Sequence, residues 1–186
     1  MLRLGLAFGL RKKEQLRIVP ATDDAVTHLL IRDNIGKSGK DREIQIIHSF
    51  QRAMLEHAKR IAGSGRHLGW PGRTFEQNQG RYAYYMKKIG VTGRDADCVG
   101  HGLRAEYAEN MSMLMGLVPA TLGGTADQMD KARREEIQMR VSEGMGHHRI
   151  NVTGAYLGSF RARPVLVRKG DIYLEHKGFK ASVKMD

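Results

Sequence analysis

The amino-acid sequence predicts one α+β domain that is mainly helical and carries a small β-hairpin. Apolar residues recur at helical spacing over residues 48–62. Two short segments rich in β-branched and apolar residues, 26–32 and 42–47, flank a glycine-rich turn, a pattern typical of an antiparallel hairpin. The chain has 186 residues and is 41% hydrophobic, which is enough to bury a core. We therefore expect a single globular domain over residues 1–186.

The remaining elements follow from periodicity and from breaker residues. Residues 2–16 are predicted to form a core helix with leucines at its end. Segments 63–73 and 90–98 are rich in glycine and other breakers, so we expect loops there. Four further helices are expected over residues 74–89, 101–117, 125–143 and 148–157.

Capping signals and the tail complete the predicted fold. Thr125 followed by Gln128 fits a capping box and predicts the start of the helix that ends near 143. Asn151 can cap the last helix. The tail is expected to form two short strands within residues 164–175, around a Lys-Gly pair.

The charge of the chain gives the first indication of function. Thirty-one Lys and Arg residues against twenty Asp and Glu residues give a formal net charge of +11 and a pI near 10.0. A basic surface attracts polyanions, which favours nucleic acid, although a ribosomal protein, a membrane-surface protein or simple solubility would also fit the charge. The single cysteine, Cys98, cannot form an internal disulfide, which favours a cytoplasmic location. No apolar run approaches the roughly 18 residues of a membrane helix, so no membrane partner is expected.

Five short segments carry residue types suited to phosphate chemistry. In chain order they are Gly9-Leu10-Arg11-Lys12-Lys13-Glu14, Gly36-Lys37-Ser38-Gly39-Lys40-Asp41-Arg42, His101-Gly102-Leu103-Arg104, Met145-Gly146-His147 and Ala155-Tyr156-Leu157. In this order and at these distances they resemble the sequence boxes of tyrosine recombinases of the phage-integrase family. Tyr156 lies nine residues after His147, the spacing which that family uses. The resemblance covers residues from about 1 to 160 and implies the mainly helical integrase-like catalytic domain.

Phosphodiester cleavage explains why these residue types belong together. Arg11 and Arg104 can neutralise a pentavalent phosphate with planar, permanently charged guanidinium groups. His147 can donate a further hydrogen bond to the same oxygens. Tyr156 is the implied nucleophile, and it needs positive surroundings because a phenol is a weak acid. The positive charge comes from side chains, so no metal ion and no other cofactor is expected.

The resemblance also implies the groups that move protons. His101 is the implied general base, and Lys37 on the hairpin is the implied general acid that protonates the leaving 5′ oxygen. Lys40 occupies the same hairpin and stays an alternative for that role, although together with Arg42 it could instead contact backbone phosphate. Glu14 lies one helical turn into the first box and is expected to hold that region in place.

The nucleophile has to be chosen among six tyrosines. Tyr173 lies in a similar Ile-Tyr-Leu setting but 26 residues past His147, so the spacing favours Tyr156. The same nine-residue spacing selects His147 over the adjacent His148. The three tyrosines of the predicted helix 74–89 are expected to pack within the fold.

Two other kinds of site fit the sequence less well. The Gly-Lys-Ser tripeptide at 36–38 lacks the glycine five residues earlier that a phosphate-binding P-loop needs. A zinc site would lack a second, closely spaced ligand pair. Its four candidate ligands would be Cys98, His101, His147 and His148.

The chain departs from the family pattern in two places. Family members carry a helical DNA-clamping domain before the first box, and because Arg11 is only the eleventh residue here, we expect this N-terminal core-binding domain to be absent. The 43 positions from Arg104 to His147 exceed the usual spacing and include an Arg-rich helix. This insertion could set target choice or oligomer contacts, or it could be a solvated helix. Residues 160–186 form a tail beyond the boxes.

The resemblance implies a site-specific DNA recombinase or integrase that cleaves and rejoins DNA through a 3′-phosphotyrosyl intermediate. The expected substrate is double-stranded DNA, on which the chain would act as a homo-oligomer, a tetramer, during integration or excision of a mobile element. The protein is expected to be encoded by a bacterium or a phage and to associate with the bacterial nucleoid. The alternatives are a catalytically inactive DNA-binding protein of the same fold and a type IB topoisomerase-like enzyme.

Overall fold

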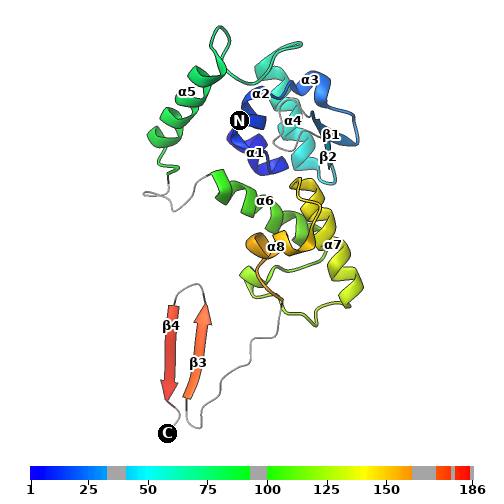
Figure 1. The fold of residues 1–186 in the computed structure, drawn as a ribbon, viewed down its shortest axis with the longest axis vertical. Coiled ribbons are helices and arrows are strands. Elements are labelled where there is room, and N and C mark those ends of the chain that lie inside the picture. Colours follow the sequence, from blue (N-terminus) through cyan, green and yellow to red (C-terminus); the bar gives the residue numbers. More distant parts are fainter. Residues whose placement is uncertain (33–40, 93–99, 161–170, 177–178, 185–186) are drawn as a thin grey trace.

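In the computed structural model the elements, in chain order, are α1 (Leu2–Phe8), α2 (Lys12–Arg17), α3 (Pro20–Asp23), β1 (His28–Ile31), β2 (Arg42–Gln45), α4 (Ser49–Ala62), α5 (Phe75–Lys88), α6 (Gly100–Leu114), the 3₁₀ turn η1 (Ala120–Leu122), α7 (Lys131–Gly144), α8 (Ile150–Leu157), β3 (Asp171–His176) and β4 (Phe179–Lys184). The structure describes residues 1–32, 41–92, 100–160, 171–176 and 179–184, with the backbone alone for the first two residues of α6 and for β3 and β4. Figure 1 shows α1 to α4 gathered around the β1–β2 hairpin, with α6, α7 and α8 packed below them. The prediction of a mainly helical chain with a small antiparallel sheet is confirmed.

The β1–β2 hairpin brings one charged side chain to the inside of the fold. The strands pair antiparallel, with Leu29 opposite Ile44 and Ile31 opposite Arg42. Because side chains alternate between the two faces of a strand, the buried positions of β2 are Ile44 and Arg42. The predicted hairpin is therefore confirmed, while its turn lies outside the described residues.

A single large hydrophobic core positions the candidate site. It joins α1, the β1–β2 hairpin, α4, α6, α7 and α8. Its most deeply buried side chains include Phe8, Leu10, Leu29, Ile44, Leu55, Leu117, Ile137, Met145 and Leu157. A smaller cluster of Leu16, Tyr82 and Met86 fastens α5 to α2. The large core thereby brings the start of α2, the inner face of β2 and the turn between α7 and α8 together.

The predicted single helix over residues 2–16 is wrong, because the chain breaks at Gly9. Gly9 ends α1 in the left-handed conformation, with φ of 60°, and α2 begins only at Lys12. A Cβ atom at Gly9 would lie 2.4 Å from Cδ1 of the buried Tyr107 ring. The position therefore requires glycine for its backbone and for its packing. The break places Arg11 at the N-cap of α2 instead of within a helix.

The predicted start of α7 near Thr125 is also wrong. The helix begins six residues later, and Asp130 caps it by accepting a hydrogen bond from the backbone N–H of Arg133 at 2.9 Å. Gln128 bonds instead to the backbone N–H and C=O of Val118. This side chain therefore closes the loop between α6 and α7 rather than a capping box.

The last helix and the tail differ from prediction in detail. Asn151 lies inside α8, and the N-cap position is Arg149, whose backbone N–H and C=O both bond to the Ser142 hydroxyl. α6 ends three residues before the predicted 117. The tail forms a hairpin, but it is shifted along the chain: β3 overlaps only the end of the predicted segment 164–175, and β4 lies beyond it. The predicted Lys-Gly turn at 169–170 lies outside the described residues.

The tyrosines of α5 pack only in part as expected. Tyr82 is buried, and Tyr85 stacks on Trp70 with ring centroids 5.7 Å apart. Tyr84 is 61% exposed, because the solvent-facing side of α5 has no neighbour among the described residues that covers it. Only Tyr82 among them is a core residue.

We predict that Gly9→Ala destabilises the protein more than Gly123→Ala. Both glycines are left-handed caps, so each alanine should carry a backbone cost of about 1–2 kcal/mol. At Gly123 nothing lies within 4 Å of the added Cβ, whereas at Gly9 the Tyr107 ring does, which should add about 1–3 kcal/mol. Urea unfolding followed by circular dichroism measures both losses. Equal losses would contradict the packing argument.

Candidate functional site

Arg11 is held at the start of α2 by the carboxylate of Glu14. Glu14 Oε2 accepts the backbone N–H of Arg11 at 2.7 Å, and Oε1 accepts a hydrogen bond from Arg11 Nη1 at 2.8 Å. An acidic side chain in the first turn suits the positive end of a helix. Glu14 is fully buried, while the Arg11 side chain remains 23% exposed. The carboxylate thus fixes a guanidinium group that solvent still reaches.

A second guanidinium group meets the same carboxylate from the β-hairpin. Arg42 Nη2 lies 3.0 Å from Glu14 Oε2, and Arg42 Nη1 lies 3.3 Å from Oε1. Burial alone would raise the pKa of Glu14, but the charges of Arg42 and Arg11 outweigh it and lower that pKa. The Arg42 side chain is 6% exposed, so in this structure it lies inside the cluster and not on the surface.

A third guanidinium group comes from α6. Arg104 Nη1 donates to the carbonyl oxygen of Gly9, and Arg104 Nη2 donates to that of Met145 at 2.9 Å. Arg104 is 3% exposed, and burial together with the charge of Arg11 lowers its pKa. Arg104 therefore ties the break after α1 to the end of α7.

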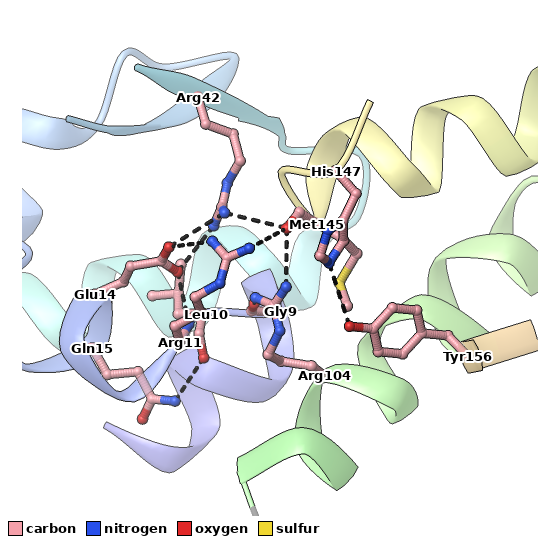
Figure 2. A network of polar contacts seen from close by, with 10 residues as sticks. All are labelled: Gly9, Leu10, Arg11, Glu14, Gln15, Arg42, Arg104, Met145, His147 and Tyr156. Carbon is pink, nitrogen blue, oxygen red and sulfur yellow. Dashed lines mark hydrogen bonds and ion pairs between the residues drawn. The ribbon is translucent and has the colours of Figure 1, made fainter. Parts of the chain in front are cut away.

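All three guanidinium groups converge on one backbone oxygen, as Figure 2 shows. The Met145 carbonyl accepts from Arg104 at 2.9 Å, from Arg11 at 3.2 Å and from Arg42 at 3.4 Å. Within the described part of the chain, Glu14 is the one carboxylate in this cluster, which leaves a net charge of about +2. Such a concentration of N–H donors and positive charge suits an anionic oxygen ligand.

The turn after Met145 carries His147 toward Tyr156. Gly146 has φ of 76°, and a Cβ atom there would lie 2.7 Å from Arg42 Nη1, so glycine lets the turn pass directly over that side chain. His147 Nε2 and the Tyr156 hydroxyl are 3.4 Å apart, with ring centroids 6.1 Å apart. The hydroxyl thus faces the imidazole beside the arginine cluster (Figure 2).

The surroundings of His147 favour its neutral form. Burial lowers the pKa of His147, and the positive charges of Arg11, Arg104 and Arg42 lower it further, with a smaller contribution from His148. A neutral imidazole offers one N–H donor and one acceptor nitrogen. One ring nitrogen can therefore hydrogen-bond with the Tyr156 hydroxyl while the other remains able to bind a second group.

The structure brings together four of the six predicted site residues: Arg11, Arg104, His147 and Tyr156. The backbone of His101 lies in the first turn of α6, one turn before Arg104, but its side chain is not described. Lys37 and the alternative Lys40 lie outside the described residues. The rival nucleophile Tyr173 lies in β3, and Figure 1 shows the β3–β4 hairpin apart from the helices.

The predicted set of site residues leaves out Arg42. Its alternation with Ile44 along β2 was the available signal, because residues two apart on a strand share a face. Its charge instead suggested a contact with backbone phosphate beside Lys40. His148 is exposed and borders a cavity of about 680 Å³ beside β2, α6 and α7.

Comparisons with known proteins add no assignment: no family model, no curated protein and no solved structure matches the chain. Among the residues that the structure describes, no three His, Cys, Asp or Glu side chains gather so as to hold a metal ion. Within the same residues, no helix combines the length and the apolar character required to cross a membrane. Function is therefore inferred from the sequence motifs and from the geometry of the arginine cluster.

We predict that His147 titrates below the usual histidine value of about 6.5. The reason is burial, reinforced by the neighbouring guanidinium groups. As the pH falls through about 6.5, the unfolded chain takes up this proton before the folded chain does, so the free energy of unfolding should fall relative to His147→Asn. An NMR titration of the imidazole C–H signals, with His147 identified by its loss in that variant, measures the midpoint. A midpoint at or above 6.5 would contradict the prediction.

Proposed function

We propose that this chain is the catalytic domain of a tyrosine recombinase, which cuts and rejoins duplex DNA through a covalent bond to Tyr156. The observation that carries the proposal is the convergence of Arg11 and Arg104 beside the His147–Tyr156 pair. Arg11 lies at the start of α2 and Arg104 in α6, while His147 lies in the turn between α7 and α8 and Tyr156 in α8. The formal net charge of +11 supports a polyanionic substrate.

The proposed reaction is a balanced exchange of ester bonds. The Tyr156 oxygen forms a bond to phosphorus while the bond from phosphorus to the 5′ oxygen breaks. The phenolic proton passes to a base, and the leaving oxygen takes a proton from an acid. The 3′-phosphotyrosyl ester keeps the energy of the cut bond, so attack by a 5′-hydroxyl of another strand reseals DNA without ATP.

The arginine cluster would supply the electrostatic part of this reaction. Arg11, at 23% exposed, would meet a phosphate oxygen from solvent. Arg104 lies behind it, and its charge would act at short range in a site with little water. The neutral His147 imidazole could donate its N–H to the same phosphate.

The resemblance supplies the remaining assignments of the proposal. His101 would accept the phenolic proton, and Lys37 would protonate the leaving oxygen. Homo-oligomeric assembly on double-stranded DNA would bring two strands into exchange. In this proposal the positive charge comes from side chains of the chain itself, and no metal ion or other cofactor takes part.

We predict that Tyr156→Phe abolishes the covalent adduct with a nicked suicide duplex on a denaturing gel. The ring keeps its packing and the lost hydrogen bond is worth about 0.5–1.5 kcal/mol, so folding and DNA binding should change little. Tyr173→Phe is the matched control and should keep the adduct. An adduct from Tyr156→Phe but none from Tyr173→Phe would move the nucleophile to Tyr173.

The same assay separates the alternatives. A wild-type protein that binds the duplex without forming an adduct would be a DNA-binding protein of this fold. A wild-type protein that forms the adduct and relaxes supercoiled DNA, but never joins two duplexes, would be a topoisomerase-like enzyme.

We predict that Lys37→Ala slows cleavage by roughly 10²–10⁴-fold, the range for loss of a general acid. A substrate with a 5′-thio leaving group should restore the rate, because a thiolate leaves without protonation. Single-turnover cleavage of the oxygen and sulfur substrates measures both effects. Rescue of Lys40→Ala instead of Lys37→Ala would transfer the role to Lys40.

A further inference from the structure

The buried carboxylate of Glu14 is shared between two guanidinium groups that differ in exposure. Arg11 reaches it from the same helix and is 23% exposed, whereas Arg42 reaches it from β2 and is 6% exposed. Each oxygen of the carboxylate accepts from both residues, counting the backbone N–H of Arg11. Neither guanidinium group therefore neutralises Glu14 alone.

Because the Glu14 carboxylate is shared with Arg42, it neutralises less of the positive charge that Arg11 presents to a ligand. Arg11 and Glu14 alone would form a neutral pair, with the carboxylate compensating the exposed charge. The buried charge of Arg42 offsets that carboxylate from the inside, and it is the leading attractive influence in the lowered pKa of Glu14. The charge of Arg11 then stays available at the surface of the cluster.

The hairpin register directs Arg42 into the cluster, and contacts with the turn after α7 hold it there. The register of the hairpin pairs Arg42 with Ile31, which is 1% exposed, and so directs its side chain inward. Its Nη1 lies 3.4 Å from the Met145 carbonyl and would lie 2.7 Å from a Cβ at Gly146. Arg42 therefore also supports the turn that carries His147.

We propose that Arg42 is a positioning residue of the proposed reaction, acting through Glu14 to keep the charge of Arg11 free for a phosphodiester. This inference rests on the proposed function. Arg42 itself does not touch DNA. Its removal leaves Glu14 to pair with Arg11 alone, and removal of Glu14 together with Arg42 takes out a neutral pair and releases Arg11 again.

The first experiment compares Arg42→Met with the double variant Glu14→Gln/Arg42→Met in single-turnover adduct formation on the nicked suicide duplex. We expect Arg42→Met to lose roughly 10²-fold in rate, the size of effect that a misplaced catalytic group produces. The double variant should recover at least about tenfold of this loss, because no uncompensated carboxylate then faces Arg11. No recovery in the double variant overturns the proposal.

Another arginine paired with a buried carboxylate, Arg32, is 47% exposed and serves as the control outside the site. Arg32 and the buried Asp23 also form a pair at 2.8 Å, between the end of β1 and α3. Arg32→Met and Asp23→Asn/Arg32→Met should leave the adduct rate unchanged while lowering the melting temperature. If Arg42→Met proves poorly folded, Arg42→Lys loses the two-pronged contact but keeps a positive charge beside Glu14, so its rate should stay within about tenfold of wild type. A loss as large as that expected for Arg42→Met overturns the proposal.

A second readout separates this inference from the proposed function. Inorganic phosphate should raise the melting temperature of the wild-type protein and of the double variant, but less that of Arg42→Met, since a ligand stabilises the state that binds it. Phosphate stabilisation in this order, with no adduct from wild type, would reject the recombinase function and keep the role of Arg42. An adduct from wild type and from Arg42→Met at equal rates would keep the function and reject the role of Arg42.

Discussion

The buried carboxylate of Glu14 is the constraint around which the site is arranged. A charge without solvent must be paired, and removing one partner of a buried pair costs about 3–5 kcal/mol. Glu14 is fully buried, and both Arg11 and Arg42 lie beside it. This pairing fixes α2 against β2, and the Met145 carbonyl that both arginines contact brings the end of α7 to the same place.

The cluster holds more positive charge than its own stability requires. Arg104 joins Arg11 and Arg42 without a carboxylate of its own among the described residues, and its bonds to Gly9 and Met145 are to neutral carbonyls. Like charges at this distance repel, and burial adds a cost, as the lowered pKa of Arg104 reflects. A cluster in which a fold retains unfavourable repulsion between charges is a candidate functional site. The excess positive charge here would favour an anionic ligand.

Sequence patterns predicted the elements better than their ends. The hairpin follows from two β-branched, apolar segments around a glycine-rich turn, and the amphipathic α4 follows from helical spacing, both of which are patterns in the local sequence. The break at Gly9 was missed because an isolated glycine is tolerated within many helices. The left-handed conformation that ends α1 there, and the close approach of the Tyr107 ring from α6, are not visible in the local sequence. The burial of Arg42 was missed for a similar reason, since the partner that makes it tolerable, Glu14, lies 28 positions earlier.

Individual residues of the first box and of the Met-Gly-His box each have a distinct structural role in this fold. In the first box, Gly9 supplies the left-handed turn, Leu10 enters the core, and Glu14 reaches back to the start of its own helix. In the Met-Gly-His box the buried Met145 presents its carbonyl to the cluster, and Gly146 lets the chain pass over an arginine. Arg11 and Met145 are 134 positions apart, so no local pattern requires them to meet. Each of these residues makes a different contact, and all of the contacts lie in one cluster, which is the arrangement that the proposed function needs.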